Sequence, residues 1–228
     1  MSWRAGRMLP AKIRQALDQY KPDIVLMGTL HGFVGLQHVA WLAEQKVPAI
    51  WKIHDYWPFC GPRMLLKNYN HSEQNCEAAT GVCRNSCGGF HPVPALLKRF
   101  PLVTGCEGGA AIMRRQGMDV AVLEEGIDTV VFRPVVSKYE VEQRAVYASG
   151  AGDDIWKGFR HLREALKGTD IELRLMMGLS REDVAAQLSV ASVFAFPSVY
   201  QETWGLSLTE AMASGCAVVA TDVAGARA

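Results

Sequence analysis

The segment from residue 194 to residue 222 constrains the fold of this chain more than any other. An apolar run over 193–196 leads into a glycine-containing loop over 201–205. A helix-like run over 206–214 and a second apolar run over 216–220 follow. This order of strand, loop, helix and strand is typical of a parallel sheet. We therefore expect the loop at the carboxyl end of a strand, where open α/β sheets bind their ligands.

Two carboxylates lie in this segment with seven residues between them, Glu202 in the loop and Glu210 in the helix. A helix that begins near Leu206 would turn unpaired N–H groups and its positive dipole end toward the loop, which favours an anion such as phosphate. Gly205 has no side chain, so a ligand could approach the backbone closely. The two acids could accept hydrogen bonds from sugar hydroxyls and a ribose diol. The segment therefore suits a nucleotide-sugar, whose diphosphate lies between two hydroxyl-bearing ends.

Two interpretations without a ligand stay open. Ser207 and Glu210 have the spacing of a capping box, which stabilises a helix start by itself. Glu202 could equally be a solvated acid in a loop. Because short motifs also match by chance, the spacing alone does not decide among these alternatives.

The segment resembles the Glu-x7-Glu signature of retaining GT-B glycosyltransferases, especially the large family four. The residues that fit this signature are Pro197, Ser198, Glu202, Gly205, Glu210, Ala211, Met212, Ala213, Gly215, Val218, Val219, Ala220 and Thr221. Three positions differ or vary. Thr203 stands where the family has the first glycine of the loop, Trp204 takes the aromatic place, and Ala217 replaces proline.

The resemblance implies roles for individual residues. In the family the first glutamate contacts the donor sugar and the second the ribose, so these roles fall to Glu202 and Glu210. Lys157 and the glycine after it resemble the family's Lys-Gly step, whose lysine binds the donor diphosphate; an ordinary surface lysine is the alternative. Ala151, six residues before Lys157, stands where the family has an arginine. The implied donor-binding set is Glu202, Thr203, Trp204, Gly205, Leu206, Glu210 and Lys157.

His54 follows the apolar run over 48–53 and begins the sequence His54-Asp55-Tyr56-Trp57-Pro58. This sequence resembles a motif in one branch of the family, whose histidine faces the cleft and contacts the donor sugar near the reacting centre. A histidine beside a carboxylate also suits proton transfer. The predicted catalytic residues are therefore His54, Glu202 and Lys157. A loop histidine that caps a backbone group is the alternative for His54, and His31 is a second cleft candidate.

The rest of the chain alternates helices with short apolar strands. We expect further strands over 24–27, 48–53, 102–105, 120–123, 144–149 and 172–176, and helices over 9–20, 34–44, 110–116, 158–167 and 181–191. This alternation argues for an α/β fold with parallel sheets.

The resemblance extends to the domain organisation. Residues 124–134 resemble the family's interdomain crossover, with Glu125 in place of the usual asparagine. It implies the GT-B type of α/β fold, with an acceptor-side Rossmann-like domain over 1–134 and a nucleotide-sugar-binding one over 135–228, facing a cleft. Compared with the family, both domains are incomplete, so we expect a chain truncated at both ends.

Four of the six cysteines fall in an irregular insertion over 55–95: Cys60, Cys76, Cys83 and Cys87. Cys83 and Cys87 have a spacing found in zinc sites, whereas Cys60 and Cys76 do not form such a pair. Two alternatives stay open: a structural zinc that ties down a long loop, or reduced thiols without a metal. No metal or other cofactor is expected for catalysis.

Net charge and apolar content limit the classes of partner that we expect. A net charge of +1 gives no reason to expect a nucleic acid. There is no apolar run of about 20 residues, as a membrane helix requires, and no signal-peptide core at the first residues. We expect a cytoplasmic protein, and the basic residues over 4–14 and 94–99 leave peripheral contact with the inner membrane face open.

The expected function is transfer of a sugar, with retention, from a UDP- or GDP-sugar donor to a glycan or lipid-linked acceptor in cell-surface polysaccharide synthesis. Three alternatives remain: a non-catalytic nucleotide-sugar-binding remnant, a zinc-organised interaction module around 55–95, and a sugar-nucleotide epimerase of the same fold.

Overall fold

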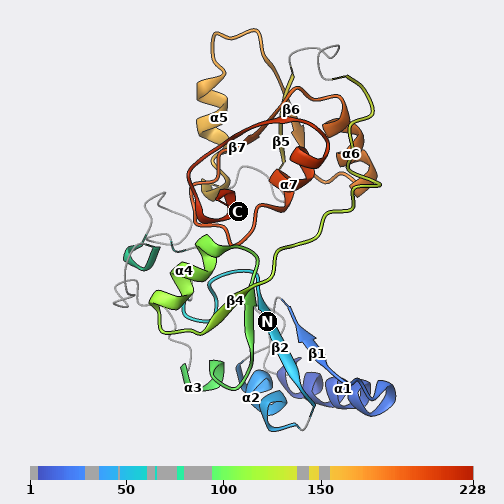
Figure 1. Cartoon of the computed structure of the whole chain (residues 1–228), viewed down its shortest axis with the longest axis vertical. Helices are drawn as coiled ribbons and strands as arrows, with labels where there is room; N and C mark the ends of the chain where they lie inside the picture. The colour runs from blue at the N-terminus through green and yellow to red at the C-terminus, as the bar shows by residue number, and fades with distance from the viewer. Residues whose placement is uncertain are drawn as a thin grey trace.

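The computed structural model describes residues 5–28, 36–45, 47–60, 65, 76–79, 94–137, 144–148 and 155–227. The chain forms two halves, one above the other along its longest axis, and each contains a parallel sheet (Figure 1). The C-terminal residues return to the junction between the halves (Figure 1).

The first sheet has the strand order β1-β2-β3-β4, all parallel, so its neighbours in space are also neighbours in sequence. Its strands are β1 (Val25–Met27), β2 (Ala49–Ile53), β3 (Leu102–Thr104) and β4 (Val120–Val122). Its helices are α1 (Ala5–Tyr20), α2 (Leu36–Glu44), α3 (Pro94–Leu97) and α4 (Glu107–Arg115), with a 3-10 turn η1 (Glu77–Ala79).

The second sheet has the order β6-β5-β7-β8, again all parallel. Its strands are β5 (Arg144–Ala148), β6 (Glu172–Met176), β7 (Val193–Phe196) and β8 (Ala217–Ala220). Its helical elements are η2 (Ile155–Lys157), α5 (Phe159–Ala165), α6 (Arg181–Ser189), α7 (Leu206–Ala213) and η3 (Ala224–Ala226). Because β6 and β7 lie on opposite sides of β5, the strand order reverses between β5 and β7. Such a switch point is where open α/β sheets bind ligands.

Each sheet has its own apolar core, and two segments cross between them. Phe132, in the connection after β4, is 1% exposed and lies in the core of the second half. Ala224, in η3, lies in the core of the first half. The halves are therefore joined by packed side chains as well as by the connecting chain.

The α/β fold with parallel sheets predicted from the sequence is confirmed, and all eight expected strands are present. Two helix starts differ by three or more residues. α1 begins at Ala5 rather than at residue 9, and α4 begins at Glu107 rather than at residue 110. The earlier start of α4 has a physical cause, since the Cys106 thiol accepts a hydrogen bond from the Gly109 N–H and caps the helix. Among the described residues, none of the helices is both long enough and apolar enough to cross a membrane.

Candidate functional site

The site lies at the switch point of the second sheet, and Gly158 explains how the chain reaches it. Gly158 has φ +70°, a conformation that glycine adopts without strain. A Cβ at this position would also overlap the Pro197 carbonyl oxygen, so only glycine fits. The Val199 N–H donates to the Trp156 carbonyl at 2.8 Å. These contacts hold η2, which follows β5, against the loop that follows β7.

Lys157 and Glu202 are brought together by this packing. The Lys157 ammonium lies 2.7 Å from Oε1 of Glu202. The Glu202 side chain is 7% exposed and that of Lys157 24%. Ser198 donates a hydrogen bond to the same carboxylate oxygen. Two groups that the sequence analysis assigned separately, to diphosphate and to sugar, are thus each other's partners in the free protein.

Aromatic rings surround this ion pair. The Lys157 ammonium lies 5.3 Å from the ring centre of Tyr200 and 5.9 Å from that of Phe196, within cation–π range. Burial raises the pKa of Tyr200 well above its ordinary value, and the charge and hydrogen bond of Glu202 raise it further. The phenol therefore stays protonated and can donate to the carboxylate. Sequence reasoning missed Tyr200, although it stands two residues before Glu202.

The structure argues against the interpretations that need no ligand. Glu202 is buried, so it is not a solvated loop acid, and Lys157 is a partnered side chain rather than an ordinary surface lysine. The capping box does not form, because α7 starts two residues earlier than that motif requires. Gly205 is the N-cap residue and provides no side-chain hydrogen bond, while Ser207 lies inside the helix.

Glu210 lies on α7, in a half-buried position. Burial raises the pKa of its carboxyl above the ordinary value, and the nearby Arg181 guanidinium offsets part of that rise. Arg181, at the start of α6, also pairs with Asp128 at 3.4 Å and lies over the Phe132 ring at 5.3 Å. Glu210 is therefore a half-buried acid whose pKa is influenced by Arg181, a cation that the sequence analysis had not linked to it.

The loop from Thr203 to Gly205 contacts the first half. The Thr203 hydroxyl donates to the His54 carbonyl at 2.6 Å, across 149 positions of sequence. A Cβ at Gly105 would lie 2.8 Å from Cβ of Trp204, so the backbone before α4 packs directly on this loop. The glycine that the family usually has at position 203 could not make the hydroxyl contact.

The close approach expected at Gly205 is made by the chain itself. A Cβ at Gly205 would lie 3.1 Å from the Gly225 carbonyl oxygen and 3.1 Å from Cβ of Leu208. Gln201 also binds η3, since its side-chain oxygen accepts from the Ala224 N–H at 2.9 Å. Leu206, the first residue of α7, is 50% exposed.

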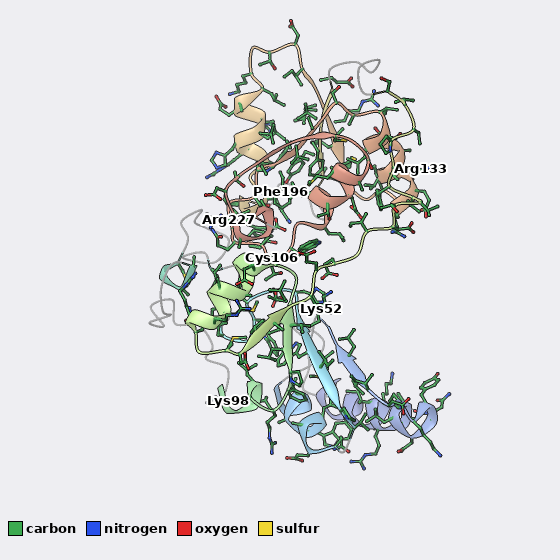
Figure 2. The ribbon with its side chains drawn as sticks, in the orientation of Figure 1. Lys52, Lys98, Cys106, Arg133, Phe196 and Arg227 are labelled. Atoms are coloured by element: carbon green, nitrogen blue, oxygen red, sulfur yellow. The ribbon has the colours of Figure 1, made fainter. Side chains whose placement is uncertain are left out.

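His54 lies just beyond the end of β2, with its side chain 39% exposed. Nδ1 of His54 is 3.5 Å from one carboxylate oxygen of Glu125, and the Lys52 ammonium is 3.0 Å from the other. Figure 2 shows Lys52 at the end of the first sheet nearest the second half. Sequence reasoning did not place Glu125 in the site, although its departure from the family's asparagine was the available signal.

Several polar groups at the junction are buried. Tyr56 is fully buried, and its hydroxyl has no hydrogen-bond partner among the described residues; the same holds for Nε1 of Trp204. Burial raises the pKa of Tyr56, and the charges of Cys106 and Glu202 add to the rise. Cys106, at the junction in Figure 2, donates its thiol hydrogen to the Ala224 carbonyl at 3.4 Å. Cys106 and Cys216 are both buried.

Two of the four insertion cysteines can be placed. Cys60 is buried and Cys76 half-buried, while Cys83 and Cys87 lie outside the described residues, as does His31. In the described part of the chain, no three His, Cys, Asp or Glu side chains are grouped as a metal site would need. The zinc alternative therefore stays a prediction.

A cavity of about 480 Å³ lies elsewhere in the first half. Apolar residues such as Phe59, Phe100 and Met118 line it, beside α3 and one face of β3 and β4. None of the predicted site residues borders it. The predicted site residues therefore lie at the carboxyl ends of β2, β5 and β7 rather than at this cavity.

Comparison with known proteins identifies a family model that part of the chain matches. Residues 130–228 match the family model of glycosyl transferases group 1. The matched glycosyltransferase region contains Lys157, Glu202 and Glu210, but neither His54 nor Glu125. None of the curated proteins compared with this sequence matches it.

Solved structures share the fold over nearly the whole chain. Alr3699/HepE of Anabaena, in complex with UDP and glucose, is similar with a TM-score of 0.58 and 15% identity, over 96% of this chain and 64% of its own. Sucrose-phosphate synthase from Thermosynechococcus elongatus gives a TM-score of 0.63 and 15% identity, over 95% and 60%. A glycosyltransferase from Rickettsia africae gives 0.61 and 15%, over 95% and 62%.

These likenesses establish the fold, which is the α/β fold of GT-B glycosyltransferases. The chain spans less than two thirds of the length of these relatives.

Proposed function

We propose that this chain is a glycosyltransferase that moves a sugar, with retention, from a nucleoside-diphosphate-sugar to a glycan or lipid-linked acceptor. The observation that carries the proposal is the Lys157–Glu202 pair at the switch point of the second sheet, inside the matched glycosyltransferase region. A partly buried cation at that position suits a diphosphate, and an adjacent acid suits sugar hydroxyls.

Donor binding would exchange partners at this pair. In the free protein the Glu202 carboxylate occupies the place beside Lys157 that an anionic donor would take. The diphosphate would bind Lys157 and the N-terminus of α7, which favours negative charge. Glu202 would then be released to accept hydrogen bonds from the donor sugar, and Glu210 would bind the ribose.

The reaction would use charge stabilisation more than a dedicated base. Lys157 would stabilise the leaving diphosphate as its charge develops, and preorganised groups of this kind are often the largest contribution to catalysis. The acceptor hydroxyl would attack on the face from which the phosphate departs. His54, presented by the first half, would contact the donor sugar near the reacting centre.

The two halves would divide the substrates, with the acceptor on residues 1–134 and the donor on residues 135–228, in the cytoplasm or at the inner membrane face. UDP-glucose is the first donor to test, because the similar Anabaena structures contain UDP, or UDP-glucose. A growing cell-surface polysaccharide is the proposed acceptor class. The zinc proposed for Cys60, Cys76, Cys83 and Cys87 would be structural and can be tested by metal analysis of the purified chain.

A second candidate is a nucleotide-sugar-binding protein without transfer activity. It is favoured by Ala151, which stands where the resemblance would place a second phosphate-binding cation. Such a protein would bind the donor at the same site as the proposed transferase but would not transfer the sugar to an acceptor.

The proposal is tested by thermal shift with UDP, GDP, ADP and their sugar conjugates. A ligand at 100 times its dissociation constant should add about 2.7 kcal/mol to the free energy of unfolding. We expect stabilisation by one nucleotide series, and its loss in Glu210→Ala. A folded sample that responds to none of these ligands would contradict the proposal. Release of nucleoside diphosphate on addition of acceptor glycans then separates a transferase from the second candidate.

A further inference from the structure

Glu125 lies on the connection between the two sheets, and its carboxylate faces the end of β2. One oxygen contacts Nδ1 of His54 at 3.5 Å, and the other contacts the Lys52 ammonium at 3.0 Å. The exposed fractions of the three side chains are 25% for Glu125, 39% for His54 and 13% for Lys52. Glu125, one of the residues that depart from the family resemblance, therefore contacts the predicted catalytic histidine.

The Glu125 carboxylate is held by a lysine on an inner strand of the first sheet. Lys52 lies on β2, which pairs with β1 on one side and with β3 on the other. Because Lys52 binds one carboxylate oxygen, the other oxygen is held toward the imidazole ring. An asparagine at position 125 would bring neither the second anionic oxygen nor the negative charge.

The opposite nitrogen of the ring lies near Gly28. Gly28 lies just beyond the end of β1, and a Cβ built on it would lie 3.9 Å from Nε2 of His54. Among the described residues other than its chain neighbours, no other atom would come within 4 Å of that Cβ. Gly28 thus places no side chain of its own beside Nε2, at the carboxyl edge of the first sheet.

We infer that Glu125 is a positioning residue, which holds the Nδ1–H of His54 and thereby turns Nε2 toward a subsite for a sugar hydroxyl beside Gly28. The partner of one ring nitrogen decides which nitrogen carries the proton. With Nδ1–H directed at a carboxylate, Nε2 keeps its lone pair and accepts a hydrogen bond from the hydroxyl. This inference rests on the proposed function for the identity of the ligand, but not for the state of the ring.

The state of the ring is read by ¹⁵N NMR of the imidazole in the unliganded chain, under conditions where the ring is uncharged. We expect the Nδ1–H tautomer in the natural protein, a shift toward Nε2–H in Glu125→Gln, and return of the first spectrum in Glu125→Asp. Glu124→Gln, at the exposed neighbouring acid, is the matched control and should change nothing. The same tautomer in Glu125→Gln as in the natural protein would overturn the inference.

The subsite is tested by calorimetry with UDP-glucose and UDP. Glu125→Gln and Gly28→Ala should weaken UDP-glucose binding about tenfold, the size of one lost hydrogen bond, and leave UDP binding unchanged. Equal weakening of both ligands would contradict a role toward the sugar. If the tautomer changes as expected but neither ligand binds, the donor assignment of the proposed function fails while the positioning role of Glu125 stands.

Discussion

A single contact, between Lys157 and Glu202, determines which groups of the donor site are available in the free protein. The carboxylate is almost completely buried, and its partner ammonium is largely so. Removing one member of such a pair leaves the other charge without compensation, which is costly in a buried position. Donor binding avoids this cost only if the diphosphate replaces the carboxylate beside the lysine. If the proposed function holds, the pair would therefore favour an anionic ligand.

The raised pKa of Glu210 leads to a second prediction at the scale of one residue, the direction in which stability changes with pH. Because burial raises its pKa in the folded chain, the ionised form opposes folding above that pKa and the protonated form does not. The stability associated with Glu210 is thus complete below the unfolded value of 4.5 and is lost as the pH rises through the folded value. Glu210→Gln should therefore raise the melting temperature of the free chain at pH 7, by about 2 °C.

The measurement is a melting curve for both proteins between pH 4 and pH 8. The advantage of Glu210→Gln should vanish toward pH 4, while stabilisation by nucleotide should be lost at every pH. A variant less stable than the natural chain at pH 7 would show that Arg181 stabilises the ionised carboxylate more than burial opposes it.

At the scale of elements, the Thr203 hydroxyl links the loop between β7 and α7 to the end of β2. Thr203→Val keeps the branched shape but leaves the His54 carbonyl without its donor. We expect a loss of about 1 kcal/mol in the free energy of unfolding, or about 2–4 °C in melting temperature for a chain of this size. Thr169→Val is the control, since that hydroxyl donates to Leu166 within the same half. Equal losses in the two variants would argue against a special role for Thr203.

The elements themselves were largely predictable, because apolar runs mark every strand and most of the helix faces. The start of α4 was not, since Gly108 and Gly109 disfavour a helix by propensity. Tertiary packing explains the glycine at position 108, because a Cβ there would lie 2.8 Å from the Ala224 carbonyl oxygen. The start of α1 was missed because Pro10 lies inside the helix, where proline is unfavourable.

The site was predictable as a set of residues but not as a set of contacts. Family resemblance identified Glu202, Glu210, Lys157 and His54 as candidates. That Lys157 contacts Glu202, or that Glu125 contacts His54, depends on how distant segments pack, and no local pattern encodes such pairings. Tyr200 beside Glu202, and Arg181 near Glu210, emerged only from the structure, because neither residue belongs to a recognisable sequence motif.

At the scale of the whole molecule, the halves are held by close backbone contact at the junction. Gly108→Ala should push η3 away from α4, because the obstructing atoms belong to the Ala224 backbone. Overpacking of this kind costs about 2 kcal/mol, and small-angle scattering should show a larger radius of gyration. Gly126→Ala is the control, with no atom within 4 Å of the added Cβ. An unchanged radius and stability in Gly108→Ala would mean that the junction yields without separating the halves.

The edge strands predict how molecules associate. β8 ends the second sheet, and Val219 on it is 65% exposed. An apolar edge strand invites pairing between chains, and a charge placed there opposes it. We expect a mass that rises with concentration in light scattering for the natural chain, and a constant monomer mass for Val219→Lys. Val130→Lys, exposed but away from any sheet edge, should behave like the natural chain. A natural chain that stays monomeric throughout would contradict this expectation.

The central claim is that Lys157 and Glu202 form a donor site, and calorimetric titration with UDP and UDP-glucose tests it most directly. Lys157→Met should weaken UDP binding at least tenfold, as expected for the loss of a hydrogen bond to a charged group of about 1.5–3 kcal/mol. Lys167→Met, at an exposed lysine on the same half, should not. Glu202→Gln should bind UDP as well as the natural chain or more tightly, because Lys157 is then free, and should lose the preference for UDP-glucose. Equal UDP affinity in Lys157→Met and the natural chain would contradict the account.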